Sequence, residues 1–243
     1  LHGVRRCCNT ATQRGRVYSA GAESVAAKTL THKISRDRFL SDDELRWLWK
    51  ACEGHAAGDI IRLLILTGQR RSEVSGLVWS ELDLANANWV LPKERAKNGI
   101  LTAVPLSSLA LGILRQVPKV SGQALLFTTT GKTPVSGWSK FKLSLDAKMT
   151  KLAKDELGED YEITPWRIHD IRRTMATNMA KLKVAVHVVE ALLNHKGGTV
   201  SGVAAIYNKY DYEAEKVEAA QAWGNYVQHL TIGLASNVVR LRG

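Results

Sequence analysis

A histidine and an arginine, His169 and Arg172, lie three residues apart in the segment Trp166–Thr174. On a helix, residues three apart project from one face, so both side chains would reach the same site. Imidazole exchanges protons near neutral pH, and guanidinium is a permanent planar cation whose donors match the oxygens of a phosphate. The pair therefore suits a phosphate site. An ordinary solvent-exposed helix explains the pair alone equally well, so the rest of the sequence must decide.

Three more side chains could join this pair. Arg70 follows an apolar helical segment, Lys97 precedes the turn-forming pair Asn98–Gly99, and His195 follows the end of another predicted helix. Each one alone is typical of a solvated turn. Together with the first pair they would form a cationic site that stabilises a pentacoordinate phosphorane through fixed donors. A downstream tyrosine could then be the nucleophile, because a cationic pocket lowers the barrier for a phenol whose pKa is near ~10.

The sequence offers little to hold a metal or an organic cofactor. No cluster of Cys, His and Asp has metal-ligand spacing, no Gly-rich phosphate loop precedes a lysine, and no serine lies in a nucleophile elbow. We therefore expect no cofactor and no metal. The three cysteines form no disulfide framework, which fits a reducing cytoplasm.

Composition favours a nucleic-acid partner. The chain of 243 residues is 45% hydrophobic, enough for a core, and its 34 Lys and Arg against 23 Asp and Glu leave a net charge of +11. Excess positive charge attracts polyanions, of which nucleic acid is the commonest. A membrane surface is the weaker alternative, because the sequence has no polybasic amphipathic segment, no run of about 18 apolar residues and no signal-peptide core.

Three regions differ in composition and pattern. Residues 1–18 hold apolar side chains at helical spacing that one short helix cannot bury alone, so they resemble the end of a larger unit. Residues 19–36 are rich in Ala, Gly, Ser and Thr, which is typical of an interdomain linker. Residues 37–243 are expected to form one domain with a C-terminal tail.

Periodicity and capping residues predict a mainly helical α+β fold for this domain. The segment at about 59–67 is apolar nearly all round, so it should be a buried central helix with Arg70 in the turn above it. Ser72 is expected to cap a short helix with Glu73 in its first turn. Further helices are expected at about 41–52, 107–117, 185–193 and 212–230, from Ser136 onward, and around His169 to about Leu182.

Between residues 81 and 105 the pattern changes from helical to extended. Apolar residues predict three short antiparallel strands, at about 82–84, 89–91 and 101–104. Asn98–Gly99 is a strong signal for a two-residue hairpin between the last two strands, which would put Lys97 at the hairpin tip. The helices should therefore be joined by a small three-stranded sheet.

Five segments resemble, in order, the motifs of the tyrosine recombinases, the phage integrase family. Residues 67–74 resemble the first arginine box, and residues 169–174 resemble the His-x-x-Arg box. Lys97 sits where the family has its hairpin lysine, and residues 193–196 resemble the Leu-Gly-His box. Residues 205–208 resemble the nucleophile segment of integrases from prophages and satellite phages. The resemblance implies a helical DNA breaking-rejoining catalytic domain.

The resemblance also implies a role for each residue around the phosphate. Arg70 and Arg172 would clamp the non-bridging oxygens of the scissile phosphate, a geometry that guanidinium supplies and lysine does not. Lys97 would protonate the departing 5′ oxygen. His169 would assist proton transfer at the nucleophile, and His195 would donate a hydrogen bond to the phosphate.

Tyr207 would be the nucleophile and would form a 3′-phosphotyrosine, so that rejoining needs neither ATP nor a metal. Tyr210 and Tyr212 lie close by, and spacing alone does not choose among the three; the resemblance points to Tyr207. Glu73 would be a supporting carboxylate near Arg70. Asn194 replaces the usual glycine of the Leu-Gly-His box, a departure that allows a left-handed conformation less freely but does not forbid it.

Double-stranded DNA with att-type sites is the partner that the resemblance implies, in the bacterial cytoplasm and associated with the nucleoid. Relatives act as tetramers, some with accessory DNA-bending proteins, and grip DNA with a second domain of which residues 1–18 would be the last helix. Whether this chain alone is monomeric stays open. Candidate DNA contacts are Lys140, Lys148, Lys151 and Arg173.

Three functions fit these observations. The first is a site-specific recombinase or integrase that integrates or excises a phage or mobile element. The second is a type IB topoisomerase-like enzyme, which would nick and reseal DNA without exchanging strands. The third is a DNA-binding fragment with weak or no catalysis. The complete set of candidate catalytic residues favours an enzyme, because a binding module need not keep them together.

Overall fold

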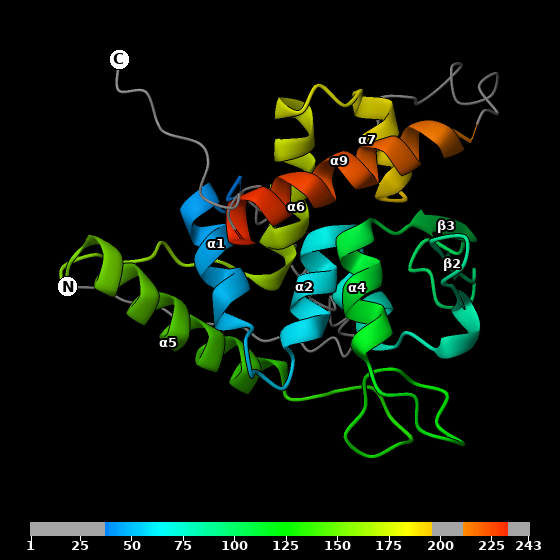
Figure 1. Ribbon diagram of the computed structural model, residues 1–243, viewed down its shortest axis with the longest axis horizontal. Helices are drawn as coiled ribbons and strands as arrows, with labels where there is room; N and C mark the ends of the chain where they lie inside the picture. Colours follow the sequence, from blue (N-terminus) through cyan, green and yellow to red (C-terminus); the bar gives the residue numbers. More distant parts are fainter. Residues whose placement is uncertain (1–36, 196–210, 233–243) are drawn as a thin grey trace, which may run out of the picture. The chain divides into compact units, whose positions relative to one another are not determined.

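The computed structural model describes residues 37–195 and 211–232 (Figure 1). The predicted remnant at 1–18, the linker at 19–36, and Tyr207 and Tyr210 lie outside these ranges. The described residues are mainly helical with one small antiparallel sheet, which confirms the predicted fold class. The helices are α1 (Asp42–Ala51), α2 (Gly58–Thr67), α3 (Arg71–Ser75), α4 (Ser108–Gln116), α5 (Trp138–Leu157), α6 (Ile168–Lys181), α7 (Val186–Leu192) and α9 (Glu213–Ile232).

Helix α2 is the centre of the core, as its apolar sequence predicts. Nearly all of its side chains are buried, and it contacts α1, α4, α6 and α9 around it (Figure 1). The buried indole of Trp223 in α9 donates a hydrogen bond to the carbonyl of Ile65 at 2.7 Å. An amphipathic helix usually buries one stripe, so burial on all sides makes α2 the element on which the others are placed.

Helix α1 begins as predicted, with a capping box in which Ser41 and Glu44 exchange hydrogen bonds. Helix α5 packs along α1, where the carboxylate of Glu156 accepts from Arg46 at 2.6 Å and from the Trp47 indole at 2.9 Å. Helix α5 itself begins at Trp138 after Gly137, slightly later than the predicted start at Ser136. No described helix is both long and apolar enough to cross a membrane.

The sheet has the order β1 (Leu82–Asp83), β2 (Asn88–Leu91) and β3 (Thr102–Pro105), with both pairs antiparallel. The predicted two-residue hairpin at Asn98–Gly99 is wrong. Leu91 pairs with Thr102, so residues 92–101 form a longer loop and Lys97 lies inside it. The Asn98 amide makes hydrogen bonds to Asn194 instead of starting a hairpin, and this distant contact outweighs the local turn preference.

Helices α6 and α7 agree with their predicted positions. The apolar stripe Ile171, Met175 and Met179 of α6 is buried in the core. Helix α7 ends in a Schellman motif, in which the N–H of His195 donates to the Glu190 carbonyl at 3.1 Å. Asn194 supplies the left-handed residue of this motif, with φ at 48°, although asparagine adopts this conformation less freely than glycine.

Gly68 ends α2 in a left-handed conformation, with φ at 62°, under tight packing. A Cβ atom there would lie 2.4 Å from the Met175 sulfur and 2.7 Å from a Leu193 methyl group. We expect Gly68→Ala to lower the free energy of unfolding by roughly 2–4 kcal/mol, because backbone strain and overpacking add. Chemical denaturation followed by circular dichroism measures the change.

Gly54→Ala is the matched control for this substitution. Gly54 has a similar φ of 61°, but a Cβ atom added there would have no neighbouring atom within 4 Å. Gly54→Ala should therefore lower the free energy of unfolding by only about 1 kcal/mol, the contribution of backbone strain. Equal decreases in the free energy of unfolding of the two variants would show that packing around Gly68 contributes nothing to the effect.

Candidate active site

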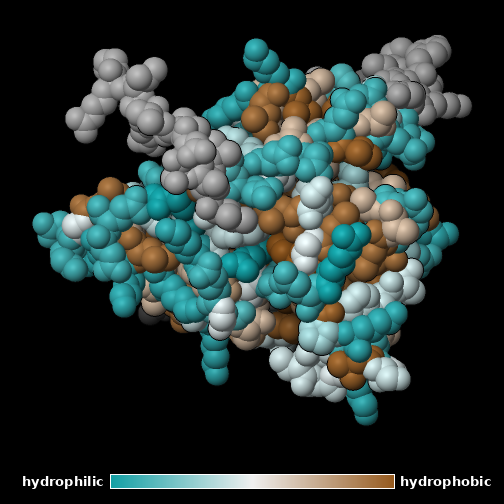
Figure 2. All heavy atoms as spheres, viewed as in Figure 1, coloured by the Kyte–Doolittle hydropathy of each residue, from teal (hydrophilic) through white to brown (hydrophobic). Residues whose placement is uncertain are grey.

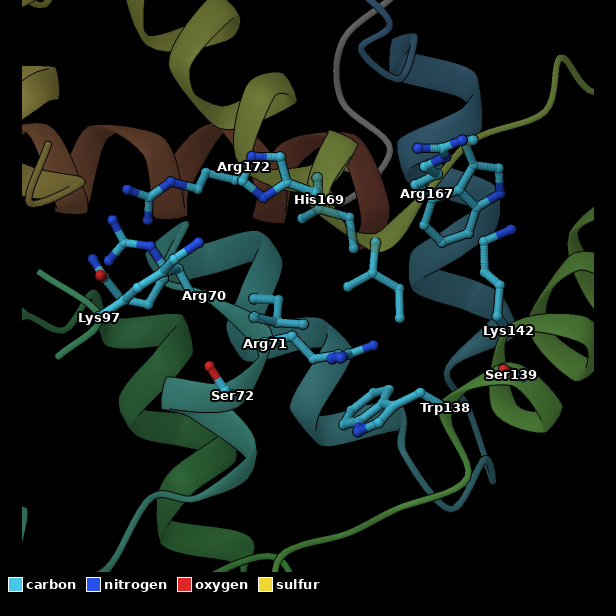
Figure 3. A pocket seen from close by; sticks show the side chains of 15 residues that line it. Arg70, Arg71, Ser72, Lys97, Trp138, Ser139, Lys142, Arg167, His169 and Arg172 are labelled. Carbon is cyan, nitrogen blue, oxygen red and sulfur yellow. The ribbon is translucent and has the colours of Figure 1, made fainter. Parts of the chain in front are cut away.

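One pocket of about 540 Å³ opens between the ends of α2, α5 and α6 and the loop that follows β2. Four of the six residues predicted to be catalytic line it: Arg70, Lys97, His169 and Arg172. Figure 3 shows these four side chains together on one side of the pocket. Arg70 and Arg172 are about a hundred residues apart in the sequence, and the fold places their side chains in one pocket.

Arg172 is the most buried of these four side chains, with 4% of its surface exposed. Its Nη1 donates to the carbonyl of Gly68 at 2.7 Å, and its Nη2 donates to the carbonyl of Leu193. Burial, helped by the positive charge of Arg70, lowers the pKa of Arg172 to about 10, so the side chain is still a cation at neutral pH. A guanidinium has five N–H donors, and the two carbonyls therefore leave donors for an anion in the pocket.

Arg70 is held by Glu73, whose side chain is 1% exposed. One carboxylate oxygen accepts from Arg70 Nη1 at 2.9 Å, and the other accepts from the Arg70 backbone N–H at 2.9 Å. The second contact places Arg70, and not the predicted Ser72, at the N-cap of α3. The reason is that a glutamate at the third position of a helix can reach back to the N-cap backbone.

The same carboxylate also holds the loop that carries Lys97. The backbone N–H of Lys97 donates to Glu73 at 3.3 Å. Arg95, two residues earlier, donates to the Glu73 carbonyl at 2.6 Å and forms an ion pair with the buried Glu81 at 3.1 Å. Sequence reasoning missed Arg95, because a charged residue among Lys93, Glu94 and Lys97 has the pattern of a solvated loop.

The two histidines feel the positive charge of the site. Burial, and then the charge of Arg172, lowers the pKa of His169, and the same two causes lower the pKa of His195. Arg70 also contributes to both shifts, so His195 lies close enough to sense the arginines although it does not line the pocket. Both imidazoles keep contact with solvent and are predominantly neutral at pH 7.

The predicted DNA contacts lie outside this cluster. Lys140 and Lys151 are exposed on α5, and the ammonium of Lys148 donates to the Glu53 carbonyl at 3.0 Å. Arg173 forms an ion pair with Asp170 at 3.2 Å and does not line the pocket. Figure 2 shows a mostly hydrophilic surface over α5.

The other side of the pocket is also cationic, which the sequence did not indicate. Arg71 lies 5.4 Å from the ring centre of Trp138, and Lys142 lies 3.9 Å from that of Trp166. Arg167 lines this side as well (Figure 3). Cations over aromatic rings are common in structures, so only the shared pocket marks these side chains as part of the site.

The described residues contain no group of three His, Cys, Asp or Glu side chains that could hold a metal ion. Within the same ranges the site consists of nitrogen donors around one buried carboxylate. Such a site can bind an oxyanion and move protons next to it, which is the chemistry of phosphate transfer.

The mainly helical fold with its small sheet carries a pocket lined by two arginines, a lysine and a histidine. Residues 38–213 match the phage integrase family, and the chain belongs to that family. No curated protein matches the chain.

Solved structures share the fold. The integrase of mycobacterium phage Brujita aligns with a TM-score of 0.54 and 16% identity over 77% of this chain and 58% of that chain. The Tn1549 transposon integrase, solved with circular intermediate DNA, gives 0.53 and 17% over 74% and 64%. A lambda integrase dimer bound to a COC′ core site gives 0.50 and 22% over 68% and 60%. The chain thus spans about three fifths of each of these proteins.

We predict that NMR titration will show pKa values below the usual ~6.5 for both His169 and His195. Arg70→Gln should raise both values, because it removes a nearby positive charge. In the wild-type chain the lowered pKa values mean that the folded state binds fewer protons than the unfolded state. The free energy of unfolding should therefore decrease as the pH falls below ~6.5, the usual pKa of histidine in an unfolded chain. Arg46→Gln is the control, since Arg46 pairs with Glu156 and contributes to neither shift. Unchanged values in Arg70→Gln would contradict the proximity of the histidines to the arginines.

Proposed function

We propose that this chain is the catalytic part of a site-specific DNA recombinase, which cleaves and rejoins DNA through a covalent 3′-phosphotyrosine. The observation that carries the proposal is the convergence of Arg70 and Arg172 on one pocket, with Lys97 and His169 beside them. Membership of the phage integrase family supports the same chemistry. Integration or excision of a phage or mobile element is the process in which we expect it to act.

The charges in the pocket suit a phosphate in its transition state. Around the proposed phosphate position, Arg70, Arg172 and Lys97 contribute three positive charges and Glu73 one negative charge. This leaves a net charge of about +2 when both histidines are neutral, before the cations on the other side of the pocket are counted. The attack of an oxygen nucleophile adds negative charge to the phosphodiester, and cations already in place stabilise that charge without reorganisation. The repulsion between Arg70 and Arg172, which contributes to the lowered pKa of Arg172, is relieved when an anion binds between them.

Proton transfer falls to the other side chains. His169, neutral at pH 7 because its pKa is lowered, can accept the proton of the attacking phenol. The ammonium of Lys97 can give a proton to the 5′ oxygen as the P–O bond breaks. His195 is proposed to donate a hydrogen bond to a phosphate oxygen.

The position of Tyr212 supports the choice of Tyr207 as nucleophile. The ring of Tyr212 packs against His187 with 4.7 Å between ring centres. His187 lies in the first turn of α7, whereas His195 follows the last turn of that helix. Tyr212 is therefore engaged at the end of α7 away from the arginine pair, and the family motif then favours Tyr207.

Double-stranded DNA is the proposed substrate, with Lys140, Lys148, Lys151 and Arg173 as proposed backbone contacts. The cationic side of the pocket formed by Arg71, Lys142 and Arg167 is consistent with a strand that continues beyond the cleaved phosphate. Assembly as a tetramer on paired att-type sites, with DNA-bending accessory proteins, is part of the same proposal. Strand exchange between two labelled sites separates a recombinase from a topoisomerase-like enzyme, which would only reseal.

The nucleophile is tested with a nicked suicide DNA site, which traps a cleaved strand on the protein. We expect a covalent adduct from the wild-type chain that is lost in Tyr207→Phe, because the phenol oxygen forms the bond to phosphorus. Denaturing electrophoresis and peptide mass mapping detect the adduct. It should form equally well with EDTA present.

Tyr210→Phe and Tyr212→Phe are the controls and should keep the adduct. An adduct that persists in Tyr207→Phe would refute the nucleophile assignment. If the wild-type chain binds its site and forms no adduct, the chain is a binding fragment and the proposed catalysis is wrong.

Arg71→Gln tests the cationic side of the pocket. We expect weaker DNA binding and a salt dependence of log K that is shallower by about one, because one fewer phosphate contact releases one fewer counterion. Fluorescence anisotropy at several salt concentrations measures both. Lys119→Gln removes the same charge near Trp79, outside the pocket, and should leave the slope unchanged. Identical slopes in the two variants would show that Arg71 acts only through net charge.

A further inference from the structure

Two asparagine side chains connect the loop of Lys97 to the turn of His195. The Asn98 amide nitrogen donates to the Asn194 side-chain oxygen at 2.6 Å and to the Asn194 carbonyl at 2.8 Å. The Asn194 amide nitrogen donates back to the Asn98 side-chain oxygen at 3.1 Å. Asn194 is 8% exposed and Asn98 is half-buried, so this reciprocal amide pair is partly shielded from water.

Each asparagine directly adjoins one of the proposed site residues. Asn98 follows Lys97, and Asn194 precedes His195. The backbone of Asn194 belongs to the Schellman turn that fixes the His195 N–H on α7. The amide pair therefore links the loop of the proposed general acid to the turn of His195, which is proposed to donate a hydrogen bond to the phosphate.

Beyond Lys97 the loop is held by hydrogen bonds and not by apolar burial. Besides the amide pair, the Asn194 amide nitrogen donates to the Ile100 carbonyl at 3.4 Å, and the Gly99 N–H donates to the Ala96 carbonyl at 2.8 Å. Ile100 is 45% exposed and Leu101 is 61% exposed, and nothing lies within 4 Å of a Cβ placed on Gly99. On the other side of Lys97, the loop is anchored by Arg95 and by the backbone contact with Glu73. Without apolar burial, side-chain hydrogen bonds must define the conformation, and Asn98 supplies them after Lys97.

The residue type at position 194 supports a role for the side chain. The left-handed backbone there is adopted most easily by glycine, and asparagine is strained by comparison. A turn that only had to end α7 would be served better by glycine. The hydrogen bonds to Asn98 offset the backbone strain of asparagine at this position.

We propose that the Asn98–Asn194 pair positions Lys97 for delivery of a proton to the leaving 5′ oxygen. This inference rests on the proposed function. In the cleavage step the tyrosine oxygen bonds to phosphorus, its proton passes to His169, and the P–O5′ bond breaks. The 5′ oxygen takes a proton from the Lys97 ammonium, which becomes a neutral amine. In this proposal Asn98 and Asn194 take no part in the bond changes and act through the position of Lys97.

The test uses DNA whose 5′ bridging oxygen is replaced by sulfur. A thiol has a pKa near ~8.5, so a thiolate leaves without the proton that an alkoxide requires. The variants are Asn98→Ala and Asn194→Gly, the second of which keeps a backbone that suits the turn. Single-turnover cleavage of bound DNA by the full chain is measured with the oxygen and the sulfur substrate.

We expect each variant to cleave ordinary DNA about tenfold more slowly, a part of the roughly 10²–10⁴-fold that a positioned acid contributes. On the sulfur substrate both should stay within about twofold of the wild-type rate. The double variant should be no slower than either single variant, because both changes remove the same pair. Thermal melting of each variant reports whether it is folded.

Two results would overturn the inference. If both variants cleave ordinary DNA at the wild-type rate, the pair does not position Lys97. If they are slowed equally on both substrates, the pair supports the fold or phosphate binding and not proton delivery. A wild-type chain that cleaves neither substrate would instead contradict the proposed function, and the inference would fall with it.

Discussion

The burial of the Arg172 guanidinium is the constraint on which the site depends. A buried charge is costly unless polar groups surround it, and here backbone carbonyls do so. The carbonyl of Gly68 comes from the end of α2, and that of Leu193 comes from the end of α7. The ends of α2 and α7 must therefore meet at one side chain of α6. This explains why both α2 and α7 stop in left-handed residues, at Gly68 and Asn194, that turn the chain away at that point.

Glu73 balances the charge of the site only in part. Its carboxylate is shared between Arg70 and the backbone of Lys97, so it orients two cations while neutralising one. Complete neutralisation would make the folded chain more stable by itself and would reduce the attraction of the pocket for an anion. The excess of positive charge is thus consistent with a site prepared for a phosphate, at some cost to the stability of the fold.

Much of this arrangement could be predicted from the sequence, because local signals and tertiary demands agree. The capping box at Ser41, the apolar faces of α2 and the His169–Arg172 spacing each indicated the observed element or proximity. The left-handed conformation of Asn194 is one that replacement of the usual glycine left allowed, without predicting it. In these segments no distant contact opposes the local preference.

The errors lie where a contact between distant segments decides the local structure. Asn98–Gly99 has the strongest hairpin signal in the chain, yet the Asn98 side chain is committed to Asn194 and the hairpin does not form. Arg95 was missed because its partners, Glu81 and the Glu73 carbonyl, come from other elements. The cationic side of the pocket was missed for the same reason. Its side chains Arg71, Lys142 and Arg167 come from separate parts of the chain, which only the fold brings together.

The contacts that hold the arginines differ in kind from those that hold Lys97. The arginines, which are proposed to stabilise charge, are fixed by helix ends and a buried carboxylate, where preorganisation is strongest. Lys97, the proposed proton donor, lies on a loop fixed by polar contacts to two separate elements. Charge stabilisation tolerates no reorganisation during the reaction, whereas a proton donor needs to be in place only when the leaving oxygen develops charge. The loop of Lys97 is nevertheless coupled to the arginines. Glu73 contacts both Arg70 and the Lys97 backbone. Asn98 binds Asn194, which follows the carbonyl that accepts from Arg172.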